Sequence, residues 1–331
     1  MEQTKAFQPK ERLPSFSIVL ETENLANADI NKLSESLNSL VNQDLSPTQA
    51  NEVLLIDSGD VPPQKLGQLR QKYPWIKVYQ APSRTGYYQA KMLGANLVTG
   101  EIVVYCDSDC IYETNWLRNL LIPFTQSDEI QIVAGETTTQ ARGIYGTAMA
   151  LTYIFPQYSQ QKTLQPTSQY FLNNVAFRRE FLLQYPIPTE LVLYRGNCAI
   201  HAHTLSSLGY TIWRQPQARA THAPPSGLSH FFWRFLLIGH DYYWQNRLLA
   251  KSQQKYSDPT AGLQGKLQIL SERLSKMFTN QPIHIIYLPL AIPIVITSVV
   301  LVLIGYVITL FHPDYLLKTY NQILGEFEVA S

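Results

Sequence analysis

The segment Glu101–Cys110, EIVVYCDSDC, constrains the fold of this chain more than any other. Its β-branched, apolar run from Ile102 to Tyr105 is typical of a strand buried on both faces, as in a parallel sheet. Asp107 and Asp109 follow at the carboxyl end of that strand, where open α/β sheets bind their ligands. Two carboxylates one residue apart can face one hard cation together, although an Asp-Ser-Asp turn that only ends the strand is the alternative.

The segments around this strand alternate between strand and helix patterns. Apolar strand runs occur at 16–21, 53–57, 76–81 and 130–136, and helical periodicity occurs at 30–41, 66–73, 87–98 and 116–124. This alternation predicts an α/β fold with a doubly wound, mostly parallel sheet. Glu21 and Asp57 end the first two strands, so we expect them at the same carboxyl edge as Asp107.

Composition limits the partners of such a domain. With 331 residues and 45% hydrophobic side chains, the chain can form one large domain with appendages. Its 26 basic and 25 acidic residues produce no basic field, which argues against nucleic acid as a partner. The three cysteines are too few for a disulfide framework, and the first 16 residues lack the apolar run of a secretory signal. We therefore expect the catalytic part in the reducing cytoplasm.

The glycine-rich phosphate loops are missing from this sequence. No G-x-G-x-x-G follows the first strand, and no G-x-x-x-x-G-K-[ST] occurs anywhere. A nucleotide would have to be held by carboxylates, a metal ion and isolated basic groups instead.

Four motifs follow one another along the chain: FSIVLETEN, VLLIDSGD, RTGYYQAKMLGANLVTGEIVVYCDSD and LGYTI…QARATH. Over roughly residues 15–225 this set resembles a family 2 glycosyltransferase with a GT-A fold, of the membrane-anchored bacterial type. The resemblance implies that a sugar passes from a nucleotide-diphospho-sugar to an acceptor, with inversion at the anomeric carbon. It also implies a divalent cation, Mn²⁺ or Mg²⁺, on the diphosphate.

The resemblance assigns roles to individual residues. Glu21 and Asp57 would contact the base and ribose, Lys91 would lie near the diphosphate, and Arg84 is a second phosphate candidate. Asp107 would contact the ribose or the metal, and Asp109 would be the main metal ligand. Asp57 could instead only form the turn before Gly59, and Lys91 could be a solvated surface charge.

Two further positions follow from the same resemblance. Asn174, in LNNVAFRRE, would line the sugar-donor pocket, although a capped helix start at Asn173/Asn174 is the alternative. His222, in ARATHAPP, would add a metal or diphosphate contact, for which imidazole is an acceptable Mn²⁺ ligand. A plain turn histidine is the alternative there.

The sequence departs from the family at Tyr194–His203, where Asn197-Cys198 occupies the place of an acidic pair. Inverting transfer needs a base that takes the proton of the acceptor hydroxyl, and neither residue is a carboxylate. We favour Glu136, which ends the predicted strand 130–136. The other candidates are His201, His203, Glu190 and Asp241.

The last third of the chain changes character. Aromatic residues crowd 227–249, which favours an interfacial or a buried helix. The polar segment 251–280 holds five basic residues against two acidic ones, and 282–311 holds no Asp, Glu, Lys or Arg. Such a run is long enough for one tilted or kinked membrane span, with a re-entrant or interfacial segment as the competing interpretation. Three acidic residues and one basic residue follow this run. Because basic residues are enriched on the cytoplasmic side of a membrane span, the basic flank before the run favours a catalytic domain in the cytoplasm.

These patterns predict five regions: a tail at 1–14, a GT-A domain at 15–225, an amphipathic connector at 226–280, a transmembrane segment at 281–312 and a tail at 313–331. The predicted function is a metal-dependent inverting glycosyltransferase at the cell membrane, with a lipid-linked acceptor or a growing polysaccharide. A catalytically altered nucleotide-sugar-binding scaffold is the main alternative. A nucleotidyltransferase is the weaker one, because its glycine- and basic-rich N-terminal loop is missing.

Overall fold

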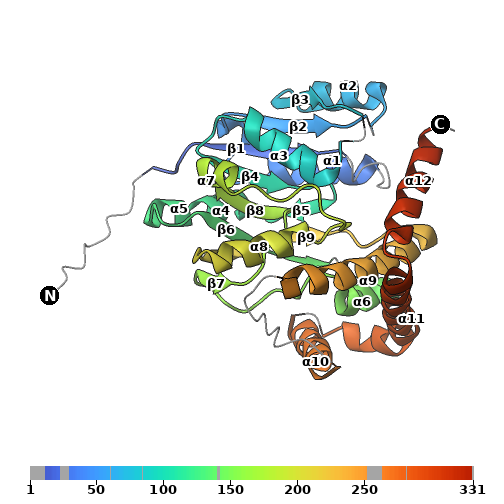
Figure 1. The fold of residues 1–331 in the computed structure, drawn as a ribbon. Coiled ribbons are helices and arrows are strands. Elements are labelled where there is room, and N and C mark those ends of the chain that lie inside the picture. Colours follow the sequence, from blue (N-terminus) through green and yellow to red (C-terminus); the bar gives the residue numbers. More distant parts are fainter. Residues whose placement is uncertain are drawn as a thin grey trace. The chain divides into compact units, whose positions relative to one another are not determined.

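The computed structural model describes residues 12–22, 30–59, 61–83, 85–139, 142–251, 263–280 and 282–329 (Figure 1). The chain divides into two units that are described separately. The first unit comprises Met1–Glu136, Gln160–Thr189 and Thr204–Ala220, and the second comprises Thr137–Ser159, Glu190–His203 and Thr221–Ser331.

Among the described residues, nine strands form one sheet in the order β3-β2-β1-β4-β8-β6-β9-β5, with β7 paired to β9. Their bounds are β1 Phe16–Glu21, β2 Val53–Asp57, β3 Ile76–Gln80, β4 Ile102–Cys106, β5 Cys110–Tyr112, β6 Ile132–Thr139, β7 Gln165–Thr167, β8 Asn174–Arg178 and β9 Ile212–His222. The boundary between the two units falls within β6 and β9.

The first four strands are parallel, as the sequence predicts. β1 lies between β2 and β4, and β2 pairs with β3, all in parallel. The side chains of β1, β2 and β4 are all buried, which explains why each strand reads as a continuous apolar run. The α/β, doubly wound fold class is confirmed.

The other half of the sheet adds antiparallel pairs. β8 pairs antiparallel with both β4 and β6, and β7 pairs antiparallel with β9. Residues 174–178 are therefore a strand, and the capped helix start at Asn173/Asn174 is wrong. Val175, Ala176 and Phe177 are fully buried between two neighbouring strands, and helix begins only at Arg179.

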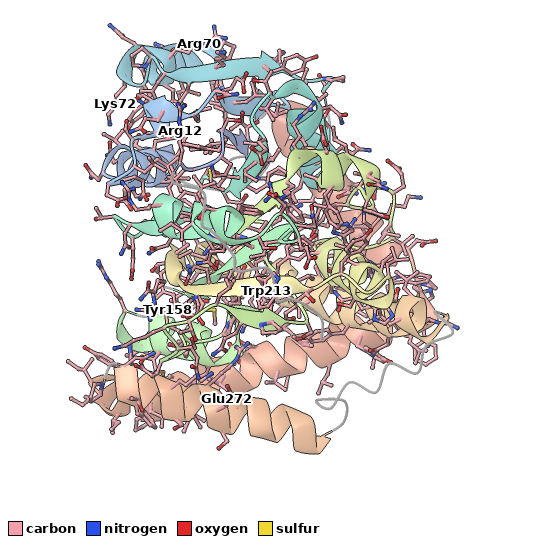
Figure 2. All side chains as sticks on the ribbon, turned by 90° about the vertical axis from the view of Figure 1, so that its left-hand side faces the viewer. Arg12, Arg70, Lys72, Tyr158, Trp213 and Glu272 are labelled. Carbon is pink, nitrogen blue, oxygen red and sulfur yellow. The ribbon has the colours of Figure 1, made fainter. Side chains whose placement is uncertain are left out.

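Helices cover the sheet of the first unit (Figure 1). They are α1 Ile30–Val41, the short 3₁₀ helix η2 Pro47–Gln49, α2 Pro63–Lys72, α3 Tyr87–Leu97, α4 Trp116–Leu121, α5 Pro123–Gln126 and α7 Arg179–Gln184. The predicted helix 116–124 is divided because Pro123 cannot continue α4 and begins α5 instead. Arg70 and Lys72, in the last turn of α2, are exposed (Figure 2), and Arg70 donates to the Val78 carbonyl of β3 at 3.5 Å.

The second unit is mainly helical. It contains α6 Gly143–Thr152, α9 Gly227–Lys251, α10 Leu263–Asn280, α11 His284–Phe311 and α12 Tyr315–Val329, while α8 Asn197–Ser207 crosses the boundary between the units. Among the described residues, only α11 is long and apolar enough to cross a membrane, on length and composition alone. It continues through Pro289 and Pro293, where the sequence suggests a kink.

Candidate functional site

Three acidic side chains lie at the carboxyl edge of the parallel strands. Glu21 ends β1, Asp57 ends β2 and Asp107 follows β4. The register pairs Glu21 with Ile56 and Val19 with Tyr105, so the three strands end at the same level. All three residues are at least 96% buried. The parallel register therefore gathers carboxylates that lie far apart in the sequence.

The carboxylate of Asp107 is held by two buried donors from α3. Lys91 Nζ lies 2.6 Å from Oδ1 of Asp107, and the Tyr87 hydroxyl donates to Oδ2 at 2.9 Å. Lys91 Nζ also donates to the Cys106 carbonyl at 2.6 Å. Lys91 is fully buried, so the alternative of a solvated surface charge is wrong. Because its two donors are fixed, the Asp107 carboxylate has one orientation.

The charge of Lys91 depends on this pairing. Burial alone would lower the pKa of its ammonium group, but the negative charges of Asp107 and Glu21 outweigh that effect and raise the pKa above its usual range. Lys91 is therefore a cation at neutral pH, although no part of its side chain reaches water.

The main chain of the Asp107 turn is fixed as well. The Asp107 amide donates to the Tyr112 hydroxyl at 2.8 Å, and this hydroxyl donates to the Asn173 carbonyl at 2.9 Å. The Ser36 hydroxyl donates to the Asp107 carbonyl at 3.0 Å. The turn that carries both aspartates is thus attached to α1, β5 and the start of β8.

Asp109 differs from Asp107 in its exposure. It lies one residue before β5 and is partly exposed, and the neighbouring Cys110 thiol points to its Oδ1 at 3.8 Å. Burial first, and then the charges of Asp109 and Asp107, raise the pKa of the Cys110 thiol well above its ordinary value. One fixed and one accessible carboxylate, beside a neutral thiol, form a donor set that fits a hard divalent cation.

Asp57 shapes the turn that follows β2. The Thr22 hydroxyl donates to its Oδ1 at 3.0 Å, and the Gly59 amide donates to the same oxygen at 3.2 Å. Asp57 therefore forms the turn before Gly59, which the sequence offered as the alternative role of this residue. Contacts of Glu21 and Asp57 with a base or ribose stay predictions, and Arg84 lies outside the described residues.

Asn174 joins three strands through its amide group. Its Nδ2 donates to the carbonyls of Glu136 and Ala218, each at 3.0 Å, and its Oδ1 accepts from Trp116 Nε1 at 2.7 Å. Both amide hydrogens are thus engaged with main-chain partners on β6 and β9. The predicted contact of Asn174 with a donor sugar stays a prediction.

The candidate bases lie in different settings. Glu136 is buried inside β6, which continues to Thr139 rather than ending at Glu136. Asp241, on α9, accepts the main-chain amides of Tyr194 and Arg195 at 2.7 and 2.8 Å, so its carboxylate fixes that loop. His201 is buried on α8, and His203 lies on the same helix. The catalytic role of Glu136 stays a prediction.

Sequence reasoning did not single out the hydroxyls of Tyr87 and Tyr112. Tyr87 could have been found, because it precedes Lys91 by four residues and so shares its helix face. Tyr112 lies on β5, and nothing in the local sequence predicts its contact with Asp107 and Asn173.

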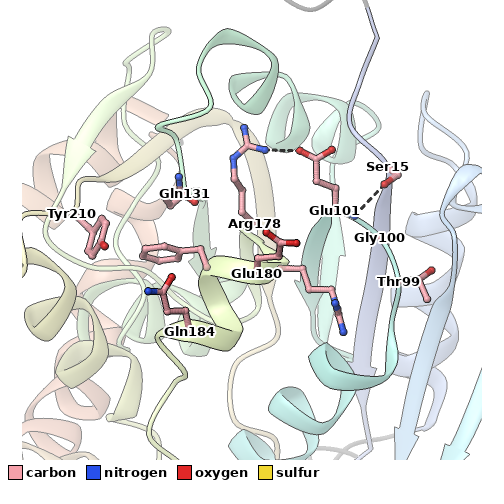
Figure 3. A pocket seen from close by; sticks show the side chains of 11 residues that line it. Ser15, Thr99, Gly100, Glu101, Gln131, Arg178, Glu180, Gln184 and Tyr210 are labelled. Atoms are coloured by element: carbon pink, nitrogen blue, oxygen red, sulfur yellow. Dashed lines mark hydrogen bonds and ion pairs between the residues drawn. The ribbon is translucent and has the colours of Figure 1, made fainter.

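A cleft of about 580 Å³ lies at the other end of β4 and is not part of this site (Figure 3). Gly100 and Glu101, just before the strand, line it together with Arg178 and Arg179. Arg178 is already bound to Glu101 at 2.5 Å and donates to the Ile130 carbonyl at 3.0 Å. The charged groups of this cleft therefore hold strand ends together.

Comparisons with known proteins agree with the fold. Residues 26–185 match the family model of glycosyl transferase family 2. N-acetylgalactosaminyltransferase 6 of Drosophila melanogaster is 29% identical over 117 residues, which are 34% of this chain and 17% of that protein. The chain thus spans less than a fifth of this relative.

Two solved structures share the architecture. The mannosyltransferase PcManGT from Pyrobaculum calidifontis, in complex with GDP-Man and Mn²⁺, has a TM-score of 0.55 at 16% identity and covers 97% of this chain and 88% of its own. GalNAc-T7 with UDP, GalNAc and Mn²⁺ has a TM-score of 0.53 at 15% identity, with coverage of 82% and 58%. Residues 26–185 are therefore similar to family 2 of the glycosyltransferases, and the chain has a GT-A fold.

Proposed function

We propose that this protein transfers a sugar from a nucleotide-diphospho-sugar to an acceptor hydroxyl, with inversion, and that a divalent cation assists. The observation that carries the proposal is the fixed Asp107 beside the accessible Asp109, at the carboxyl edge of a family 2 sheet. The bound GDP-Man, UDP and Mn²⁺ named for the two solved structures support this donor class and cation.

The proposed cation ligands are Asp109, Asp107 and His222. Asp109 is partly exposed, and Oδ2 of Asp107 accepts one hydrogen bond, from the Tyr87 hydroxyl, which leaves it a lone pair for a cation. His222 is the last residue of β9 and is proposed as a ligand from the resemblance of ARATHAPP to the family segment. When bound, Mn²⁺ or Mg²⁺ would neutralise the charge that develops on the leaving diphosphate.

The remaining residues of the carboxyl edge have proposed roles around the donor. Glu21 and Asp57 would hold the base and ribose. Lys91, predicted near the diphosphate, would act chiefly by orienting Asp107, because its ammonium group is already bound there. Arg84 remains the second phosphate candidate and Asn174 a donor-pocket residue. Glu136 would take the proton from the attacking hydroxyl.

The acceptor and the location are proposed from the second unit. The helix α11 contains no Asp, Glu, Lys or Arg, and it places a long apolar surface on the same chain as the site. We therefore propose a lipid-linked or growing-polysaccharide acceptor at the cytoplasmic face of the cell membrane. The basic segment 251–280 before α11 favours the anionic cytoplasmic leaflet.

The test is release of nucleoside diphosphate from a panel of nucleotide sugars by the full chain in detergent, with Mn²⁺ or Mg²⁺ and a lipid extract as acceptor. Asp109→Asn keeps the shape of the side chain but removes its charge, and we expect it to lower release by at least about a hundredfold. EDTA should have the same effect. Glu35→Gln, at an exposed position on α1, is the matched control and should keep full release.

The departure at Asn197-Cys198, where α8 begins, favours one second candidate, a nucleotide-sugar-binding scaffold. Binding of a nucleotide sugar without release of nucleoside diphosphate from any donor, with the acceptor extract present, would support the scaffold over the transferase. Release of inorganic diphosphate instead would point to nucleotidyl transfer.

A further inference from the structure

The long helix α11 is packed along its whole length by one face. His284, Ala291, Ser298 and Gly305 are buried and follow each other at intervals of seven residues, and Thr309 continues this face. Residues seven apart lie nearly above one another on a helix, so these side chains form one straight stripe. Within the second unit α11 packs against α6 and α9 (Figure 1), so the buried stripe lies against these two helices.

The first half of the stripe is attached to α6 and α10. His284 Nδ1 and the Thr147 hydroxyl share a hydrogen bond of 2.8 Å. Leu288 and Val295 pack against Leu151 of α6 and Met277 of α10. The start of α11 thus lies against helices of the second unit rather than extending away from them.

The second half is attached to α9 at backbone distance. A Cβ atom on Gly305 would lie 2.0 Å from the Leu236 carbonyl oxygen, and one on Gly239 would lie 2.1 Å from that of Val302. Because Gly239 and Gly305 have no side chain, the backbones of α9 and α11 can approach each other this closely. Four residues after Gly305, Thr309 Oγ1 lies 3.2 Å from Nδ1 of His240.

Polar, irregular backbone lies beside this second half. His240 Nε2 is 2.9 Å from the Val192 carbonyl, and Asp241 binds the amides of Tyr194 and Arg195. Arg234, one turn and a half earlier on α9, donates to the Tyr153 hydroxyl at 2.7 Å. The charged side chains of Arg234 and Asp241 and the non-helical loop around Tyr194 therefore lie beside the last two turns of α11.

The opposite face of α11 is exposed and aliphatic. Ile286, Leu290, Ile296, Val299, Leu303 and Phe311 are 50–72% exposed and run from one end of the helix to the other. With 28 residues, the helix is about 42 Å long. This surface, the outer face of α11, is longer than the hydrocarbon core of a bilayer, which is about 30 Å thick.

A helix packed in this way cannot cross a bilayer alone. If α11 stood upright in the membrane, α6, α9 and the loop around Tyr194 would enter the hydrocarbon region with it. Irregular backbone and charged groups are not stable where lipid surrounds them. The packed stripe and the aliphatic outer face are compatible when the helix lies flat, with one face in lipid and the other on protein.

We propose that α11 lies in the plane of the membrane surface, with its outer face in the acyl-chain boundary of one leaflet and both ends on the same side. The inference rests on the proposed membrane location and specifies its geometry. Lipid fits the outer face better than a second copy of this chain does, because the six residues named are aliphatic apart from Phe311. Protein interfaces are instead enriched in Tyr, Trp, Met and Arg. The basic segment 251–280 favours an anionic leaflet.

The test is thiol labelling from one side of the membrane. The three native cysteines are buried, so the unmodified chain measures the background labelling. Pro282→Cys and His312→Cys place single thiols at exposed positions just outside the two ends of α11. Each full-length variant is treated with a membrane-impermeant maleimide in inside-out cell membrane vesicles, before and after permeabilisation.

The in-plane helix predicts that both thiols are labelled to the same extent before and after permeabilisation. If one of the two thiols is labelled before permeabilisation and the other becomes labelled only afterwards, α11 crosses the membrane. That result would overturn the in-plane inference but leave the membrane location intact. Protein that does not remain with the vesicles would overturn both. Nucleoside diphosphate release in detergent is unaffected by either result and tests the transferase separately.

A depth measurement provides the second readout. Spin labels at Ile286→Cys, Ile296→Cys and Val307→Cys report the start, middle and end of the outer face. An in-plane helix predicts similar, shallow depths at all three positions. A maximum depth at Ile296 with shallow ends would indicate a span and contradict the inference.

Discussion

At the scale of single residues, the site depends on a lysine that has no access to water. Lys91 and Asp107 are 0% and 5% exposed at their side chains, and they form an ion pair of 2.6 Å inside the protein. Such a pair contributes little net stability relative to apolar residues, but removing one partner leaves an uncompensated buried charge. Its proposed role in function is orientation, because the Tyr87 hydroxyl and Lys91 together hold the carboxylate of Asp107.

We predict strong coupling between Lys91 and Asp107. Lys91→Met should lower the free energy of unfolding by about 3–5 kcal/mol, because Asp107 then remains buried without a cation. The double variant Lys91→Met/Asp107→Asn should recover about 1–3 kcal/mol of that loss. Denaturant unfolding of the purified chain measures both values.

Lys77→Met is the matched control for this cycle. Lys77 is exposed on β3, and its loss should change stability by at most about 0.5 kcal/mol. Additive effects of the two substitutions at Lys91 and Asp107 would show that the pair does not orient the site.

The same pair predicts a pH dependence. The folded-state pKa of Lys91 lies above its ordinary value of 10.5, since Asp107 and Glu21 outweigh the cost of burial. The contribution of the protonated lysine is therefore complete below pH 10.5 and decreases as the pH rises through the folded-state pKa. The difference in unfolding free energy between the unmodified chain and Lys91→Met should be constant from neutral pH upward and then shrink above pH 10.5. A difference that already shrinks near neutral pH would contradict the raised pKa.

At the scale of secondary-structure elements, the site rests on the point where β6, β8 and β9 meet. The Asn174 amide connects the three strands, and a Cβ atom on Gly135 would lie 2.2 Å from both the Ala218 carbonyl oxygen and Asn174 Oδ1. These are rigid main-chain and hydrogen-bonded atoms, so β6 cannot accept a side chain at this position. Glu136, the proposed base, is the next residue on the strand.

We predict that Gly135→Ala destabilises the protein by about 1–3 kcal/mol, because the methyl group must displace β9 or break the Asn174 contacts. It should also lower nucleoside diphosphate release through the displacement of Glu136. Thermal unfolding and the release assay check the two effects.

Gly67→Ala is the matched control, since a Cβ atom there meets nothing within 4 Å on the exposed face of α2. It should be neutral or stabilising by up to about 1 kcal/mol, and equal effects of the two substitutions would contradict the close-approach argument.

At the scale of the whole molecule, the two units carry different parts of the proposed activity. The family match ends at residue 185, and the carboxylates of the proposed donor site belong to the first unit. The apolar outer face of α11 belongs to the second unit, in a region that the family model does not match. The donor class is thus proposed from the family domain, whereas the acceptor class is proposed from the helices that follow it.

The sequence by itself determined the parallel strands and the aspartates at their ends. β1 and β2 begin and end where the apolar runs predict, and β4 extends one residue beyond its run. Buried parallel strands need apolar residues at consecutive positions, and this local requirement can be read without a structure. The same holds for α11, whose long uncharged apolar run is visible in the sequence.

Only the tertiary structure decided how individual side chains are used. The burial of Lys91, the three-strand role of Asn174 and the hydroxyl of Tyr112 all depend on residues that are distant in sequence. The orientation of α11 is decided in the same way, because the stripe that α6 and α9 cover is defined by their contacts. Periodicity in a sequence reports how one element faces its surroundings, but the identity of the neighbouring atoms follows from the register and packing of the folded chain.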